Sequence, residues 1–172
     1  RVEIERQDLA AARQALQQMM TRLEGVPAGE LLRLGQLWTL LGNPPQVGKI
    51  LDRLKTAPGV EPGALPDIAV LLLQTGRGTE GLDFIRRFAP EREGGAVERA
   101  WALLAVGAGD TAEVGAWLAR QDWKAADREY LSTLYYVASQ SNDAITTLAL
   151  AQIRNRLFPS PENSFLLADA LL

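Results

Sequence analysis

Four turns recur along this 172-residue chain at almost constant spacing, and this period restricts the fold more than any other feature of the sequence. A glycine or serine anchors each turn: Gly42, Gly76, Gly109 and Ser139. The anchors are 34, 33 and 30 residues apart, and an aliphatic residue follows each one nine residues later: Leu51, Ile85, Leu118 and Leu148. A period of about 20 to 50 residues is typical of repeat proteins. The sequence therefore predicts a row of similar packing units.

Each unit has the pattern of a helix hairpin. Apolar residues recur at spacings of three and four, and no stretch alternates between apolar and polar residues for long enough to predict a strand. The leading segment, 2–24, carries such a stripe and stops at Gly25. Short helices that are joined by short turns indicate antiparallel hairpins. We therefore predict an all-α fold of about ten helices.

Two of the four units resemble the tetratricopeptide repeat. Leu34-Gly35, Trp38 and Gly42 match the Leu-Gly pair, the aromatic residue and the turn of that family, and Leu131, Tyr135 and Ala144 match in the last unit. The resemblance implies a right-handed α-solenoid over residues 1–172, with full repeats at 28–61, 62–94, 95–125 and 126–159. Residues 1–27 would be the second helix of a preceding repeat, and 160–172 the first helix of a following one. We accordingly expect the chain to be a piece of a longer protein.

The composition argues against several kinds of chemistry. The chain has no His and no Cys, which excludes His-based catalytic triads, ordinary zinc sites and disulfides, so we expect neither a metal nor a cofactor. Carboxylate pairs such as Glu91 with Glu93 and Asp127 with Glu129 lie in polar turns, where solvated charge is usual, and Asp110 suits a helix N-cap. A net charge of -3 gives no basic surface for nucleic acid, which disfavours RNA binding. We therefore expect a protein without catalytic activity.

In the tetratricopeptide family, ligand peptides commonly lie along the concave face that the first helices of the hairpins form. Carried over position by position, the resemblance places these residues on that face: Leu32, Gln36, Thr39, Pro66, Val70, Leu73, Arg99, Leu103, Val106, Glu129, Thr133 and Tyr136. The face is largely apolar. It lacks the Lys, Asn and Arg clamp of family members that bind chaperone tails, since Leu32 and Gln36 occupy two of its places. Such a groove accepts a helix or an extended segment, or else neighbouring helices fill it.

The function that we expect is a protein–protein interaction scaffold. The amino-acid composition of the repeats is rich in Arg, Ala, Gly and Leu and poor in Lys. In this it resembles the periplasmic repeat region of bacterial exopolysaccharide exporters of the Pel type, with the cellulose type as second choice. That resemblance implies a periplasmic location in a biofilm secretion apparatus. It also implies a polysaccharide-modifying enzyme as partner, and polymer that is guided to an outer-membrane pore.

The alternative is a solenoid that itself binds or processes carbohydrate. Trp123 is the candidate contact, because it lies in the polar stretch 120–124, where it is either a packed turn residue or an exposed recognition ring. No apolar run reaches the roughly 18 residues that a spanning helix needs, so we expect no membrane insertion by this segment.

Overall fold

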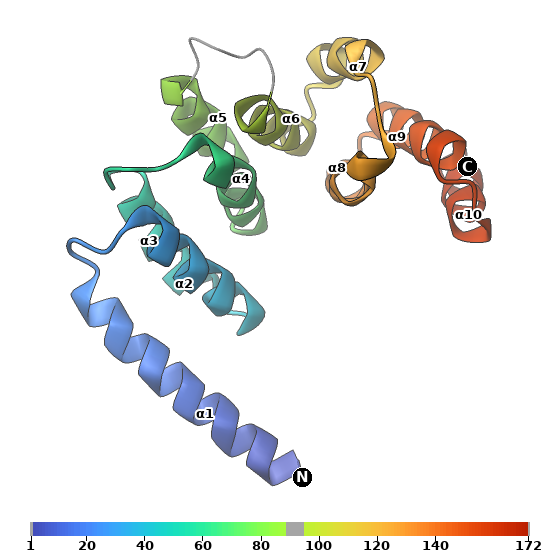
Figure 1. Ribbon diagram of the computed structural model, residues 1–172. Coiled ribbons are helices and arrows are strands. Elements are labelled where there is room, and N and C mark those ends of the chain that lie inside the picture. The colour runs from blue at the N-terminus through green and yellow to red at the C-terminus, as the bar shows by residue number, and fades with distance from the viewer. Residues whose placement is uncertain (1, 89–94, 172) are drawn as a thin grey trace.

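The computed structural model describes the backbone of residues 2–88 and 95–171, with side chains for 9–88, 95–124 and 126–171 (Figure 1). Within these ranges it contains ten α-helices, four short 3-10 helices and no strand, so the predicted all-α class is confirmed. The α-helices are α1 (Val2–Met19), α2 (Ala28–Leu40), α3 (Pro44–Leu54), α4 (Leu65–Gln74), α5 (Gly78–Ile85), α6 (Ala96–Ala108), α7 (Thr111–Arg120), α8 (Arg128–Gln140), α9 (Ala144–Leu157) and α10 (Pro161–Asp169). Glu91 and Glu93 lie outside the described residues.

Four inter-helix turns share one backbone conformation. Each contains a residue with positive φ: Gly42 (64°), Gly76 (71°), Gly109 (74°) and Asn142 (54°). The N–H of the following residue donates to the carbonyl five residues earlier, at 2.8 to 3.3 Å, which is a helix-ending motif that satisfies otherwise unpaired carbonyls: Asn43 to Trp38, Arg77 to Leu72, Asp110 to Ala105, and Asp143 to Ala138.

The fourth turn corrects the sequence analysis. Ser139 lies inside α8, and the turn residue is Asn142, three residues later. Asparagine tolerates the left-handed region better than most residues with a side chain, and it can therefore take the place of glycine here. The turn residues are thus 34, 33 and 33 residues apart, a more regular period than the sequence suggested.

Side-chain caps begin several of the helices. Asn43, Asp110, Asp143 and Ser160 each accept a hydrogen bond from the backbone N–H three residues later, so the predicted cap at Asp110 is confirmed. Asp143 also accepts from the Thr111 hydroxyl at 3.0 Å, which links α9 to α7. Burial raises the pKa of Asp143, but hydrogen bonds from Thr146 and Thr111 outweigh burial and hold that pKa below its ordinary value.

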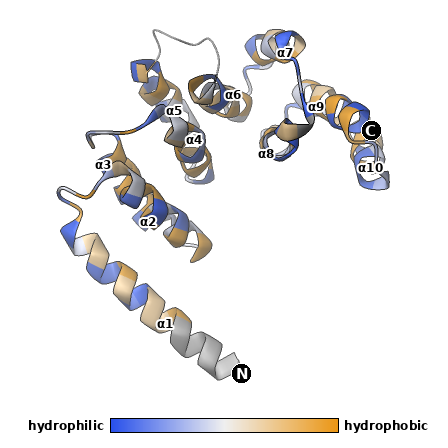
Figure 2. Cartoon of the chain, in the orientation of Figure 1, coloured by the Kyte–Doolittle hydropathy of each residue, from blue (hydrophilic) through white to orange (hydrophobic). Residues whose placement is uncertain are grey.

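The core repeats with the turns. The positions four residues before, and eight and nine residues after, each turn residue are buried in all four units: Trp38, Leu72, Ala105 and Ala138; Ile50, Phe84, Trp117 and Leu150; Leu51, Ile85, Leu118 and Ala151. Along the helices, hydrophilic and hydrophobic residues are interspersed, as expected where one face is buried (Figure 2). The main contacts join helices that are neighbours, or next-but-one neighbours, in the chain. Each unit therefore stabilises mainly the adjacent ones.

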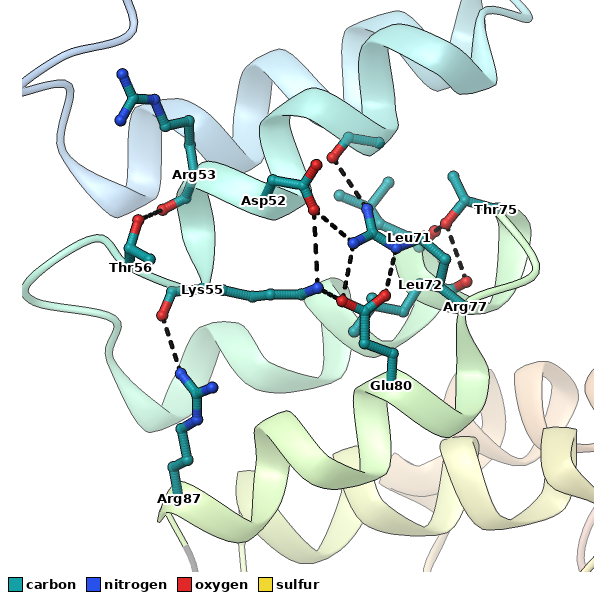
Figure 3. Close-up of polar contacts among 11 residues, drawn as sticks. Asp52, Arg53, Lys55, Thr56, Leu71, Leu72, Thr75, Arg77, Glu80 and Arg87 are labelled. Atoms are coloured by element: carbon teal, nitrogen blue, oxygen red, sulfur yellow. Dashed lines mark hydrogen bonds and ion pairs between the residues drawn. The ribbon is translucent and has the colours of Figure 1, made fainter.

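An ionic cluster joins α3 to the start of α5 (Figure 3). The Arg77 guanidinium donates to Asp52 at 2.5 Å, to Glu80 at 2.5 and 2.9 Å, and to the Gly48 carbonyl at 3.0 Å. The Lys55 ammonium pairs with Glu80 and Asp52. Burial lowers the pKa of Lys55, and the positive charge of Arg77 lowers it further. The cluster fixes one hairpin against the next through geometry that only a planar guanidinium supplies.

Helix α1 packs less closely. Its Arg13 guanidinium donates to the Leu41 backbone carbonyl at 3.5 Å. The side-chain oxygen of Gln17 accepts a hydrogen bond from the side-chain amide of Gln46 at 3.2 Å. Leu16 is buried, but Leu9 and Met19 are exposed. Most of the apolar packing of the chain therefore lies from α2 onward.

Candidate functional site

A groove of about 770 Å³ lies between α4 and α8, with the C-terminal end of α6 at its base. In Figure 1, α4 and α8 lie on either side of α6. The lining residues are Val70, Leu73 and Gln74 from α4, Gly107 from α6, and Glu129, Ser132, Thr133, Tyr136, Val137, Gln140 and Ser141 from α8 and its end. The groove thus combines three successive hairpins, and the residues that α4 and α8 contribute are about 60 residues apart in the sequence.

Gly107 allows the two walls to approach. A Cβ at this position would lie 2.2 Å from Leu73 Cδ2 and 3.4 Å from Val137 Cγ1. The Leu73 side chain therefore occupies space that any other residue at position 107 would fill. The Ser141 hydroxyl also lies 3.5 Å from the Gly107 carbonyl. The base of the groove consequently depends on a glycine that the sequence analysis did not single out.

Five of the residues that the resemblance placed on the concave face line this groove: Val70, Leu73, Glu129, Thr133 and Tyr136. Tyr136 is the most open apolar member, with 64% of its surface exposed. Gln36 and Thr39 lie on α2, away from the lining, and the Thr39 hydroxyl donates to the Gly35 carbonyl at 3.0 Å. Arg99 is not in the lining either, because its guanidinium pairs with Asp127 at 2.5 Å.

Three predicted residues are core residues. Leu32, Leu103 and Val106 are 8%, 1% and 0% exposed, so the expectation that they offer a surface to a partner is corrected. Leu103 and Val106 lie on α6, which α4 and α8 contact from two directions. An apolar side chain in the middle helix is covered by both neighbours, and the sequence pattern alone does not distinguish such a position from an open one.

The polar groups of the groove fall into two sets. The hydroxyls of Ser132, Thr133 and Ser141 donate to carbonyls of their own helix at 2.8 to 3.1 Å. Within the described part of the chain, the side-chain amides of Gln74 and Gln140 make no hydrogen bond. Both are two residues before a turn residue, as is Gly107. The sequence analysis singled out neither glutamine, because this register position was not among those that the resemblance placed on the concave face.

A separate aromatic cluster contains Trp123. Its four rings form a row with successive ring centroids 6.2, 5.4 and 6.4 Å apart, in the order Trp101, Trp117, Trp123 and Tyr130. The Trp117 indole N–H donates to Glu98 at 2.7 Å. The Tyr130 hydroxyl donates to the Arg99 carbonyl at 2.8 Å, and burial raises its pKa. Trp123 is half-buried and packs against the core, as the packed-turn interpretation expected, but it also borders a pocket of about 460 Å³.

No protein-family model, no curated protein and no solved structure matches this chain. Among the described residues, no three acidic side chains converge in a way that would hold a metal ion. None of the helices in the described ranges has the length and apolarity to cross a membrane.

Proposed function

We propose that this chain is a solenoid of the tetratricopeptide type that holds a protein segment in the groove between α4 and α8 and catalyses no reaction. The repeated left-handed turns, the repeated core positions and the contacts between successive hairpins support the repeat architecture. The groove of about 770 Å³ carries the functional part of the proposal.

The chemistry of the groove favours binding. Val70, Leu73, Tyr136 and Val137 give it apolar surface, and a partner side chain that covers this surface would contribute the hydrophobic term of binding. Glu129 is the one charged residue among the described lining residues. Within this lining Glu129 has no second charged group with which to form an acid–base pair, and the serine and threonine hydroxyls already donate to helix carbonyls.

The setting that we propose for this scaffold is bacterial exopolysaccharide secretion in the periplasm, with the Pel type first and the cellulose type second. The support is the compositional texture of the sequence. In this setting the partner is a polysaccharide-modifying enzyme, which the scaffold keeps close to the polymer on its way to an outer-membrane pore.

The test uses affinity capture from cells that naturally express the chain. The baits are the wild type, Val70→Glu and Tyr136→Asp in the groove, and Ile145→Asp as matched control. Ile145 is an apolar residue on α9 that is 71% exposed and does not line the groove. We expect a protein that the wild type and Ile145→Asp retain and that both groove variants lose, while circular dichroism shows unchanged helix content.

Two outcomes oppose the proposal. If Tyr136→Asp and Val70→Glu retain the same proteins as the wild type, the groove is not the binding site. If glycan alone is retained, direct carbohydrate binding replaces the scaffold function. The observation that favours this second candidate is the pocket of about 460 Å³ beside Trp123, which also contains Arg99, Gln121 and Asp122. In that case Trp123→Ala should abolish glycan retention.

A further inference from the structure

We infer that the groove between α4 and α8 recognises an extended peptide segment, and that a Lys or Arg of this segment pairs with Glu129. This inference rests on the proposed function and specifies the chemistry of the partner.

The first argument is charge. Glu129 is exposed on the first turn of α8 and has no ion-pair partner within the described residues. Neighbouring cations are engaged elsewhere, because the Arg128 guanidinium lies 5.6 Å from the Phe158 ring centroid and that of Arg99 pairs with Asp127. An uncompensated carboxylate beside apolar surface attracts a cationic side chain and repels an acidic one. The groove therefore selects a segment with a basic residue at this point.

The second argument is hydrogen bonding. Gln74 on α4 and Gln140 on α8 are exposed, lie on opposite walls and hold equivalent positions before their turn residues. Each amide has donors and an acceptor, which matches the N–H and C=O of a peptide unit. An extended segment has these backbone groups free, whereas a helix has already paired them internally. The two glutamines are thus complementary to an extended backbone.

The third argument concerns the base of the groove. Val70, Leu73 and Val137 are aliphatic, and Tyr136 is the single aromatic ring in the lining. Saccharide rings are usually held against aromatic faces, while alternate side chains of an extended peptide fill aliphatic hollows. The lining thus favours a peptide over a polysaccharide in this groove.

The experiment is a selection of random displayed peptides on the purified wild type, on Glu129→Gln and on Glu162→Gln. Glu162 is the matched control, because it lies in the first turn of α10, as Glu129 lies in the first turn of α8. We expect a basic residue at one position of the peptides selected on the wild type and on Glu162→Gln, and no such preference on Glu129→Gln. A synthetic copy of the best peptide should bind Glu129→Gln about tenfold more weakly, or about 1.4 kcal/mol, and with less salt dependence.

The amides are tested with the same peptide. The double variant Gln74→Ala/Gln140→Ala should weaken binding about tenfold, whereas Gln152→Ala, an exposed glutamine on α9, should not. The circular dichroism of the bound peptide should show no gain of helix.

Three results overturn the inference: peptides without basic enrichment, equal affinity for Glu129→Gln, or a peptide that becomes helical when bound. If such a peptide is nevertheless lost with Tyr136→Asp, the groove binds a segment of other chemistry and the proposed function stands. If peptide binding is unaffected by Tyr136→Asp, the proposed function fails as well.

Discussion

Gly81 offers a direct test of how tightly the hairpins pack. It lies inside α5, and a Cβ there would be 2.6 and 3.0 Å from the Leu104 methyl carbons and 3.1 Å from Leu72 Cδ1. Leu104 and Leu72 are at most 1% exposed, so neither side chain has open space to move into. The perturbation that we choose is Gly81→Ala, with Gly115→Ala as its control. Gly115 lies inside α7, and a Cβ there would meet nothing within 4 Å.

The expected magnitude follows from two opposing terms. Alanine is better than glycine inside a helix by about 1 kcal/mol, and this term stabilises both variants. An added methyl in a closely packed core costs about 1 to 3 kcal/mol, and this term applies to Gly81 alone. Gly81→Ala should therefore lower the free energy of unfolding by about 1 kcal/mol, with a range from about 0 to 2. Gly115→Ala should raise it by about 1 kcal/mol.

The assay is urea unfolding followed by the helical circular dichroism signal, with an unchanged m-value as the condition for reading midpoints as stability. Trimming Leu104 to valine should recover part of the loss in the Gly81→Ala background, because the two sites are in contact and their effects are not additive. If Gly81→Ala and Gly115→Ala stabilise equally, Leu104 and Leu72 yield without cost and the reasoning is refuted.

Three further predictions concern the turns and the polar joints. Asp143→Ala should lower the free energy of unfolding by about 1 kcal/mol through loss of the N-cap. Folding lowers the pKa of Asp143 from 3.8. The ionised carboxylate therefore adds to the free energy of unfolding above about pH 4, and this contribution is lost as the pH falls further. Thermal melts of wild type and Asp143→Asn from neutral to acid pH should converge at the acid end, and a constant difference would contradict this. Arg77→Lys should lower the free energy of unfolding by about 1 to 2 kcal/mol, since a lysine ammonium cannot reproduce the guanidinium geometry that reaches Asp52, Glu80 and Gly48 together. An unchanged urea midpoint would contradict this prediction. Asn142→Val should lower the free energy of unfolding by about 1 to 2 kcal/mol, because valine is disfavoured at positive φ. Asn142→Gly should leave it nearly unchanged. Equal urea midpoints for the two variants would show that the turn does not strain a residue with a side chain.

Much of the fold could be predicted from local pattern. Apolar residues at spacings of three and four give the helices, and Gly42, Gly76 and Gly109 give three of the four turns, because each of these signals acts within a few residues of chain. The fourth turn was misplaced, since Ser139 and Asn142 are both acceptable turn residues in isolation. Only the helix that continues to Gln140 distinguishes them.

The candidate site divides in the same way. The sequence by itself determined the helical pattern, and its resemblance to the tetratricopeptide repeat placed five residues of the groove on one face: Val70, Leu73, Glu129, Thr133 and Tyr136. Tertiary structure alone decided which of these faces stays open, because the exposure of a residue depends on the neighbours that cover it. The packing of α4 and α8 against α6 buries Leu103 and Val106, and the missing side chain of Gly107 lets Leu73 and Val137 close over the base of the groove.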